Sequence, residues 1–323
     1  MKRVDPVGNP RYPNAKPDTI TYNSLLNCCA KVKPSELKTA LQLFKRMRAD
    51  QVQPDTVTFN SLLSCCCTPP GKGSDAKTAI SVFEEMFRVT RSTGERVYSN
   101  IDPDTQTFNY IIRAVSTRSP DNGGPHVPSV MKLVRDMVST HPNGKPVYPR
   151  AVPNLVTWGV ALSACASAQP PCVDDAFALV EIARKHNQRL TPRIVNYVLQ
   201  ACSNANPVRL ADGISILEQS QREQCRSNAF TLLFALRLFG KCEPEMRSTD
   251  LAEEWLRALV HNGSLIKPSS RYWAEEVFGH ERATELMDWA EKTLTDVVGV
   301  RSATIPDDMD EDGDDGFVRY DFK

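Results

Sequence analysis

Apolar residues recur along the chain at the spacing of one face of an α-helix. The first such face consists of Tyr22, Leu25, Leu26 and Cys29, and the next copy consists of Phe59, Leu62, Leu63 and Cys66. Both sets follow the positions i, i+3, i+4 and i+7, which predicts amphipathic helices. No alternation of period two persists, so strands are not predicted.

A second apolar stripe follows each of these faces and predicts a second helix. Its copies are Ala40, Leu43, Phe44, Met47; Ala79, Val82, Phe83, Met86; Val130, Leu133, Val134, Met137; Ala176, Leu179, Val180, Ala183; Gly213, Ile216, Leu217, Ser220; and Ala252, Trp255, Leu256, Leu259. The repeating unit is therefore expected to be a helical hairpin, and the chain an array of such units.

Proline followed by a capping residue marks the start of each unit. Pro17-Asp18 and Pro54-Asp55 are the clearest examples. Proline ends the preceding helix, and the Asp or Asn side chain caps the next one. Unit boundaries are predicted at Asp18, Asp55, Asp104, Asn154, Arg193, Asn228 and Ser269.

These boundaries divide the chain into four segments. Residues 19–269 are expected to form about six hairpins, and 1–18 the end of a preceding repeat or a linker. Residues 270–298 read as a capping helix region that covers the last hairpin, with partner docking as the alternative. That region carries Trp273, Val277, Phe278, Leu286 and Trp289. Residues 299–323 read as an acidic disordered tail.

Gly, Pro and Asn gather in four longer connections, at 68–75, 88–101, 118–128 and 140–153. Such composition is typical of surface loops, so these insertions are expected to lengthen turns without disturbing the helices. A specific contact role for them is the alternative.

The distribution of charge and of cysteines indicates the kind of partner and the redox compartment that suit the chain. The formal net charge is zero, but 306–323 holds eight acids and two basic residues, which leaves the rest of the chain mildly basic. The ten cysteines fall mostly at equivalent points of successive repeats, which favours packing thiols in a reducing compartment. No apolar run is long enough to span a membrane, and the first residues do not read as a clear targeting peptide.

The phrase Pro-Asp-Thr-x-Thr-Tyr-Asn-Ser-Leu-Leu, followed by Ala-Leu-x-Leu-Phe-x-x-Met, resembles the pentatricopeptide repeat family. The resemblance covers residues 17–269 and is strongest for the first three units. The Trp-x-x-Leu-Gly-x-x-Tyr pattern of tetratricopeptide repeats is absent. The resemblance implies an all-α, right-handed α-solenoid of stacked helical hairpins, which forms a superhelix.

The resemblance also implies non-catalytic binding of single-stranded RNA, with about one base per repeat. The implied base-contacting pairs are Asn23 with Asp55, Asn60 with Asp104, and Asn109 with Asn154. The implied base-stacking residues are Ile20, Val57, Gln106 and Val156. An Asn amide carries both a donor and an acceptor, so it can face a base edge, while the acidic partner orients it.

Further expectations rest on the resemblance alone. They are a pyrimidine-leaning target, a role in organellar RNA processing, stability or translation, and a location in a mitochondrion or plastid. Other RNA-processing proteins are implied as partners, and no cofactor, metal, membrane or small-molecule substrate is implied.

The later repeats depart from this pattern. Gly159, Val198 and Leu233 are assigned to the amide position, with Arg193, Asn228 and Ser269 as partners. Glycine and aliphatic side chains cannot hydrogen-bond a base edge, so these units are expected to support the array or to touch phosphate only.

Two alternatives stay open. The Asn residues can simply be helix-entry residues, and the same surface can serve as a protein-binding scaffold without RNA. Other candidate chemistry is weak: the five His residues are scattered, the Gly-rich 70–74 lacks phosphate-loop spacing, and the calcium-like run from Asp308 places Arg319 where a Glu is needed.

Overall fold

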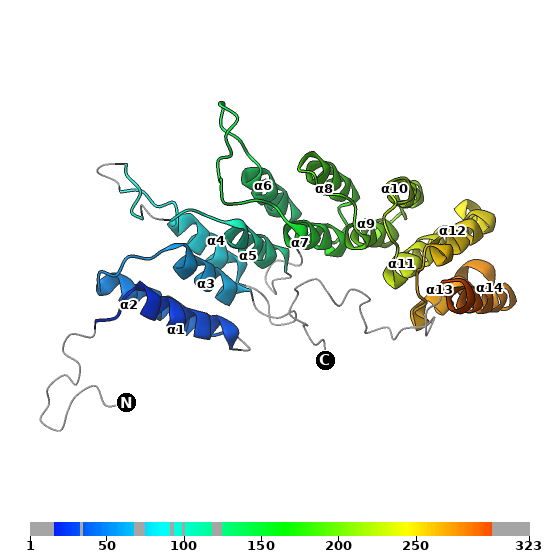
Figure 1. Ribbon diagram of the computed structural model, residues 1–323, viewed down its shortest axis with the longest axis horizontal. Helices are drawn as coiled ribbons and strands as arrows, with labels where there is room; N and C mark the ends of the chain where they lie inside the picture. Colours follow the sequence, from blue (N-terminus) through cyan, green and yellow to red (C-terminus); the bar gives the residue numbers. More distant parts are fainter. Residues whose placement is uncertain are drawn as a thin grey trace, which may run out of the picture. The chain divides into compact units, whose positions relative to one another are not determined.

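The computed structural model describes residues 16–32, 35–67, 75–90, 94–98, 101–117 and 125–298. Every regular element in these ranges is a helix, and β pairing there is limited to the isolated bridges Val89–Arg96 and Thr140–Pro146 (Figure 1). The Gly-rich run at 70–74, the calcium-like run and the acidic tail lie outside the described residues, as do residues 1–15 of the N-terminal segment.

The chain divides into two compact units, Met1–Gly123 with Lys132–Pro153 and Gly124–Met131 with Asn154–Lys323. The helices up to α6 are α1 Thr19–Lys31, α2 Leu37–Ala49, α3 Thr56–Cys66, α4 Ala76–Glu85, α5 Thr105–Ser116 and α6 Val127–Met137. Those of the second unit are α7 Leu155–Ser167, α8 Val173–Lys185, α9 Pro192–Asn204, α10 Leu210–Arg222, α11 Ala229–Gly240, α12 Thr249–His261, α13 Pro268–Phe278 and α14 His280–Thr293. Two short elements, η1 Pro244–Met246 and η2 Leu294–Val298, complete it.

The predicted caps begin most of the odd-numbered helices, which we call the first helices of the hairpins. The side chains of Asp18, Asp55, Asp104, Asn154 and Asn228 each accept a hydrogen bond from the backbone N–H three residues on. After all of these except Asp18, the third residue is a Thr whose hydroxyl accepts the cap's own N–H, which completes a capping box.

Two predicted boundaries are wrong by two residues. Helix α9 is capped by Thr191, not Arg193, and α13 follows Lys267, not Ser269. In both places the proline is the first residue of the helix rather than the residue before the cap, a position that suits its fixed φ and missing N–H. The corrected interval from Asn154 to Thr191, and from Thr191 to Asn228, equals that from Asp18 to Asp55.

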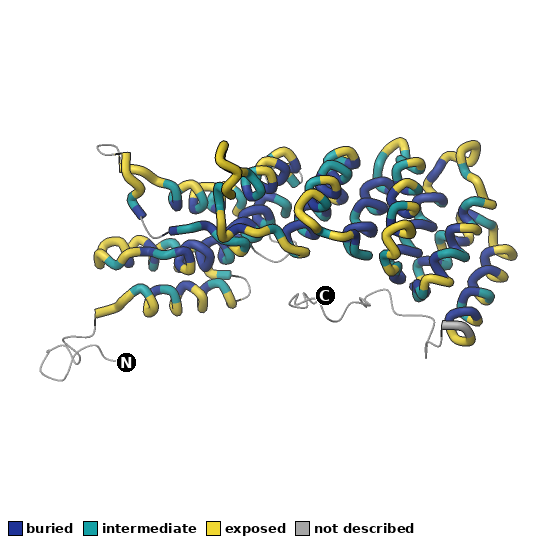
Figure 2. Tube along the Cα trace, turned by 45° about the horizontal axis from the view of Figure 1, so that its top comes forward, coloured by how far each residue is buried: buried dark blue, intermediate teal, exposed yellow. Residues whose placement is uncertain are grey.

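First helices pack on first helices, and the second helices α2, α4, α8, α10 and α12 pack beside their own partners. In the first unit α3 contacts both α1 and α5, and in the second unit α9 contacts α7 and α11, while α11 also contacts α13. Figure 1 shows α7, α9 and α11 in one row and α8, α10 and α12 in another. The stripes predicted for α8 and α12 are fully buried, and buried positions recur along each helix in Figure 2.

A helix that has neighbours on both sides buries more of its surface. Leu62 on α3 is fully buried, whereas its counterpart Leu25 on α1 is 46% exposed. The difference arises because α3 lies between α1 and α5, while α1 contacts only α2 and α3 among the described residues. Burial of Leu25 was predicted from periodicity and is not observed.

Most of the repeat cysteines pack between helices as predicted, but Cys28 is exposed. Cys29, Cys66, Cys165 and Cys202 stand at the same point of their repeats, each is buried, and all ten thiols of the chain are free. Burial raises the pKa of the Cys165 thiol to about 12 and that of Cys202 to about 12, so both are protonated near neutral pH.

The insertions contribute aromatic rings to the core of the first unit. Tyr98, from the connection after α4, is 4% exposed, packs edge-on against Phe59 and donates its hydroxyl to Glu85 at 2.9 Å. Tyr148, from the connection after α6, packs against Phe108 with ring centroids 5.1 Å apart. These two connections are therefore anchored segments with a packing role, beyond a simple lengthening of turns.

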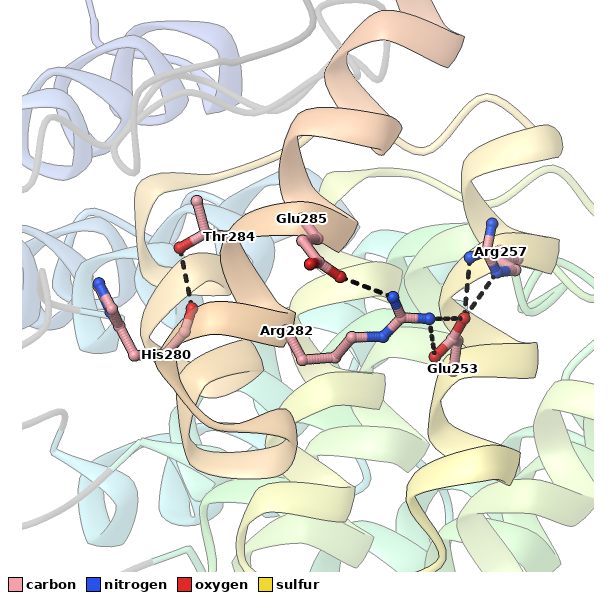
Figure 3. A network of polar contacts seen from close by, with 6 residues as sticks. All are labelled: Glu253, Arg257, His280, Arg282, Thr284 and Glu285. Carbon is pink, nitrogen blue, oxygen red and sulfur yellow. Dashed lines mark hydrogen bonds and ion pairs between the residues drawn. The ribbon is translucent and has the colours of Figure 1, made fainter.

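The segment predicted as a capping helix is a further helical pair. Helix α13 begins at Pro268, so the boundary at 269 falls inside it, and Gly279, with φ +79°, separates it from α14. Arg282 on α14 bonds both carboxylate oxygens of Glu253 on α12, which also accepts from Arg257 (Figure 3). Hydrogen bonds from Arg257, and then from Arg282, lower the pKa of Glu253.

Two helical glycines provide a test of the packing. A Cβ at Gly213 of α10 would lie 2.2 Å from a methyl carbon of the fully buried Leu238 on α11, whereas one at Gly159 meets nothing nearer than 3.6 Å. Gly213→Ala is expected to lower the free energy of unfolding by about 1–3 kcal/mol through overpacking. Gly159→Ala is expected to raise it by up to about 1 kcal/mol through helix propensity. Urea denaturation of both variants checks this, and equal stability of the two would contradict the close approach of α10 to α11.

Candidate functional site

On three of the first helices, α1, α3 and α9, the side chain five residues after the cap bonds the cap of the next first helix. We call this the amide position. On α1 it is Asn23, whose Nδ2 donates to both carboxylate oxygens of Asp55, at 3.0 and 3.2 Å. Its Oδ1 accepts the hydroxyl of Thr58 at 2.6 Å. The capping box of α3 therefore holds the Asn23 amide in one orientation.

The same constellation recurs between α3 and α5. Asn60 Nδ2 donates to Asp104 at 3.1 Å, and its Oδ1 accepts the hydroxyl of Thr107 at 2.7 Å. Asp104 in turn accepts the Thr107 backbone N–H at 2.9 Å, which caps α5. One carboxylate thus serves both as a helix cap and as the partner of the preceding amide.

The third predicted pair is divided between the units. Asn109 stands at the amide position of α5 in the first unit, where it is half-buried. Asn154 begins the second unit and caps α7 through the backbone N–H of Thr157 at 3.1 Å. The pairing of Asn109 with Asn154 stays a prediction.

A further pair lies between α9 and α11, where the sequence reading placed Val198. The amide position of α9 is Asn196, whose Nδ2 donates to Asn228 at 2.9 Å and whose Oδ1 accepts the hydroxyl of Thr231 at 2.7 Å. Val198 is fully buried in the core. The signal that identifies Asn196 is Thr191, a capping residue five positions earlier that precedes a proline.

Two repeats lack an amide, as predicted. Gly159 stands at the amide position of α7, and atoms of Arg193 and Tyr197 from α9 lie within 4.0 Å of where its Cβ would be. Leu233 stands at the amide position of α11, and the corrected partner position there is Lys267. Ser269, the predicted partner, lies two residues inside α13.

The amides are recessed and the residues predicted to stack on bases project beside them. Asn60 is 7% and Asn196 8% exposed, while Ile20 is 74% and Val57 55% exposed. Gln106 is also exposed, and Val156 is half-buried. A flat group that slides between the projecting side chains of successive repeats would bring its edge to the recessed amide.

Each bonded amide keeps hydrogen-bonding capacity toward such an edge. An amide nitrogen has two N–H groups and the oxygen two lone pairs. For Asn23 the partners described above use one side of the amide, which leaves a donor and an acceptor for a ligand. The partner residue differs in chemistry: the carboxylate of Asp55 can only accept hydrogen bonds, and both of its oxygens accept from Asn23, whereas the side chain of Asn228 also carries N–H donors.

Other kinds of site are not evident in the part of the chain that the structure describes. Within it, no three His, Cys, Asp or Glu side chains gather where they could hold a metal ion. No helix in the same part has the length and apolar character needed to cross a membrane.

Comparisons with known proteins agree with the helical-repeat fold. Residues 17–68 match the model of the PPR repeat family. The maize pentatricopeptide repeat protein PPR10 is similar in structure, with a TM-score of 0.53 at 16% identity, over 87% of this chain and 34% of that protein. The chain thus spans about a third of the length of the maize protein. No curated protein matches the chain in sequence.

Two further solved structures are similar at lower scores. The PPR domain of Arabidopsis thaliana protein-only RNase P 1, solved with tRNA, has a TM-score of 0.49 at 15% identity, over 74% of this chain and 98% of that one. PPR10 in complex with a psaJ RNA element has a TM-score of 0.44 at 16% identity, over 89% and 40%.

The similarity to the maize protein confirms the predicted fold class, an all-α solenoid of stacked helical hairpins. Residues 17–68 therefore match the PPR repeat family, and the described helices share the fold of a pentatricopeptide repeat protein.

Proposed function

We propose that this chain binds single-stranded RNA without catalysis, and that recessed amides of its first helices meet the base edges. The observation that carries the proposal is the constellation found three times: Asn23 with Asp55, Asn60 with Asp104, and Asn196 with Asn228. A helix cap needs no such amide, so a capping role alone does not account for the pairing.

The physical logic is preorganisation. A side-chain amide that is already held by a neighbouring cap loses little rotamer freedom when it meets a ligand. The exposed side chains of Ile20 and Val57 offer apolar surfaces to base faces, a contact worth about 1–3 kcal/mol per base. Phosphate contacts would come from the mildly basic body of the chain, and they make the affinity fall with salt.

The finer expectations belong to this proposal as well. A pyrimidine-leaning target, a mitochondrial or plastid location, and a role in RNA processing, stability or translation follow from family resemblance. Asp55 and Asp104 carry acceptors only, whereas Asn228 also carries N–H donors, and this difference makes the repeats differ in the base they favour.

The proposal is tested by the affinity of the full chain for labelled oligo-U, oligo-C and oligo-A at two salt concentrations. We expect binding that weakens steeply with salt and favours pyrimidines. The triple variant Asn23→Ala, Asn60→Ala and Asn196→Ala is expected to lose that preference, because each mismatch or lost edge contact typically costs about 1–3 kcal/mol.

The matched control carries Gln42→Ala and Gln221→Ala, which remove exposed amides from the second helices α2 and α10. The control should bind all three oligonucleotides like the unaltered chain. Absence of measurable RNA binding by the unaltered chain, together with a co-purifying protein, would replace this proposal by a protein-binding scaffold.

A further inference from the structure

Aromatic side chains occupy one register position on three successive first helices of the second unit. Six residues after each cap stand Tyr197 on α9, Phe234 on α11 and Trp273 on α13, all half-buried. On α1 and α3 the same position holds Ser24 and Ser61. This position lies four residues after that of the predicted stacking residues Ile20 and Val57, so the rings stand on the same face of their helices as the stacking position.

The rings of α11 and α13 are paired with further rings and closely supported. Phe230 and Phe234 stack with centroids 6.3 Å apart and an interplanar angle of 24°, and the Nζ of the fully buried Lys267 lies 3.8 Å from the Phe230 centroid. Trp273 lies against the backbone of α11 at Gly240, where a Cβ would meet the ring at 2.7 Å.

Edge-reading groups are replaced on these two helices. The amide position holds Leu233 on α11 and Tyr272 on α13, and Tyr272 is 56% exposed and packs edge-on against Trp273 at 5.1 Å. Phe230 stands two residues after its cap, where Ile20 and Val57 stand on α1 and α3. On α11 and α13 the side chains at these positions are therefore apolar or aromatic, whereas on α1 and α3 the amide position holds Asn23 and Asn60.

Cations accompany the rings. The Cζ of Arg237 lies 5.8 Å from the Trp273 centroid, and its Nη2 donates to Asn204 at 2.8 Å. Lys241 follows one turn later on α11. Among the described residues no carboxylate forms an ion pair with Arg237 or Lys241. Burial lowers the pKa of Arg237, and burial together with the charge of Arg237 lowers that of Lys241.

We propose that this face of α9, α11 and α13, which we call the aromatic face, holds single-stranded RNA by stacking its bases on the rings while Arg237 and Lys241 meet its phosphates. The inference rests on the proposed RNA binding and deepens it. Every base has a π-face, so this part of the chain grips RNA without selecting its sequence. Sequence is then read by the amides alone, and the aromatic face supplies affinity.

RNA is favoured over a protein as occupant for two reasons. Arg237 lies near the Trp273 ring, and neither Arg237 nor Lys241 forms an ion pair within the part of the chain that the structure describes, so these cations complement a polyanion. The face also belongs to the same helices as the Asn196–Asn228 pair, because Asn196 precedes Tyr197 on α9 and Asn228 caps α11.

The test compares Tyr197→Leu, Phe234→Leu and Trp273→Leu with the unaltered chain, each with oligo-U and oligo-A. Loss of one ring is expected to weaken binding of both oligonucleotides about tenfold, and equally, because stacking is tolerant of sequence. Arg237→Gln is expected to reduce the salt dependence of binding. Met246→Ala, which removes a side chain 65% exposed on η1, is the control and should bind normally.

Fluorescence separates stacking from altered folding. Trp273 is more accessible than the buried Trp158 and Trp255, so RNA should quench part of the tryptophan emission. Trp273→Phe should keep the affinity and lose that quenching.

The outcomes distinguish the two proposals. If the chain binds RNA with its pyrimidine preference and the ring variants bind like the unaltered chain, the aromatic face is not an RNA site, while the amide proposal stands. If Phe234→Leu instead releases a co-purifying protein and leaves RNA affinity unchanged, the face serves a protein partner and the inference is overturned. If no RNA binds, both proposals fail.

Discussion

Replacement of Phe59 by alanine is expected to lower the free energy of unfolding of the first unit by about 3–5 kcal/mol. The ring is fully buried on α3 and joins three parts of the unit. It packs edge-on against Phe44 of α2 at 5.4 Å and against Tyr98 of the insertion at 5.5 Å. Its removal therefore leaves a cavity among groups that cannot all move in to fill it.

Urea denaturation followed by circular dichroism, with hydrogen exchange of α3 and α5, measures the effect. Ile20→Ala is the control, because that apolar side chain is 74% exposed on α1 and contributes little to the core. A loss below about 1 kcal/mol for Phe59→Ala would mean that Tyr98 does not pack on α3, since large buried aromatic truncations cost more than that.

The second large effect is expected from Asp55, whose carboxylate both caps α3 and holds the amide of Asn23. Asp55→Ala should lower stability by about 0.5–2 kcal/mol through loss of the cap. It should also weaken oligo-U binding about tenfold, because the freed amide of Asn23 no longer has a fixed orientation.

Asp18→Ala separates these two roles. Asp18 caps α1 in the same manner, through the backbone N–H of Thr21 at 2.8 Å, and no Asn among the described residues bonds to it. It should lose comparable stability and keep its RNA affinity. Equal RNA affinities of Asp18→Ala and Asp55→Ala would show that the amide orientation is irrelevant to binding. Asp55→Asn should retain the cap, as Asn228 does on α11.

Much of the fold could be predicted because each repeat carries the same local sequence signals for the start and the buried face of its helices. Asp55 and Asp104 predict helix starts because their side chains can cap a helix. The apolar stripes of the second helices predict buried faces because of their spacing. These signals are local, so they can be interpreted without knowing which other helices pack against the segment.

The errors have physical causes. Proline precedes the cap at Pro54-Asp55 but follows it at Thr191-Pro192, and both placements obey the same helix-start chemistry. Because Pro192 was interpreted as the residue before the cap, the predicted boundary fell at Arg193, two residues after the actual cap Thr191. The shift hid Asn196 and the alignment of Tyr197 with Phe234.

Other features depend on contacts between distant segments. Nothing in the local sequence of the insertion indicates that Tyr98 meets Phe59, because its environment is supplied by α3 and α4. The pairing of Asn23 with Thr58 likewise joins two repeats, and it becomes visible only when the first helices are stacked.

Crosslinking tests the central claim most directly, namely that RNA meets the amides of the first helices in each unit. The chain would be irradiated with oligonucleotides that contain 4-thiouridine, and the modified residues mapped by mass spectrometry. The account predicts crosslinks on α1, α3 and α9 near Asn23, Asn60 and Asn196. Crosslinks confined to the second helices α2, α4, α8 and α10 would contradict it.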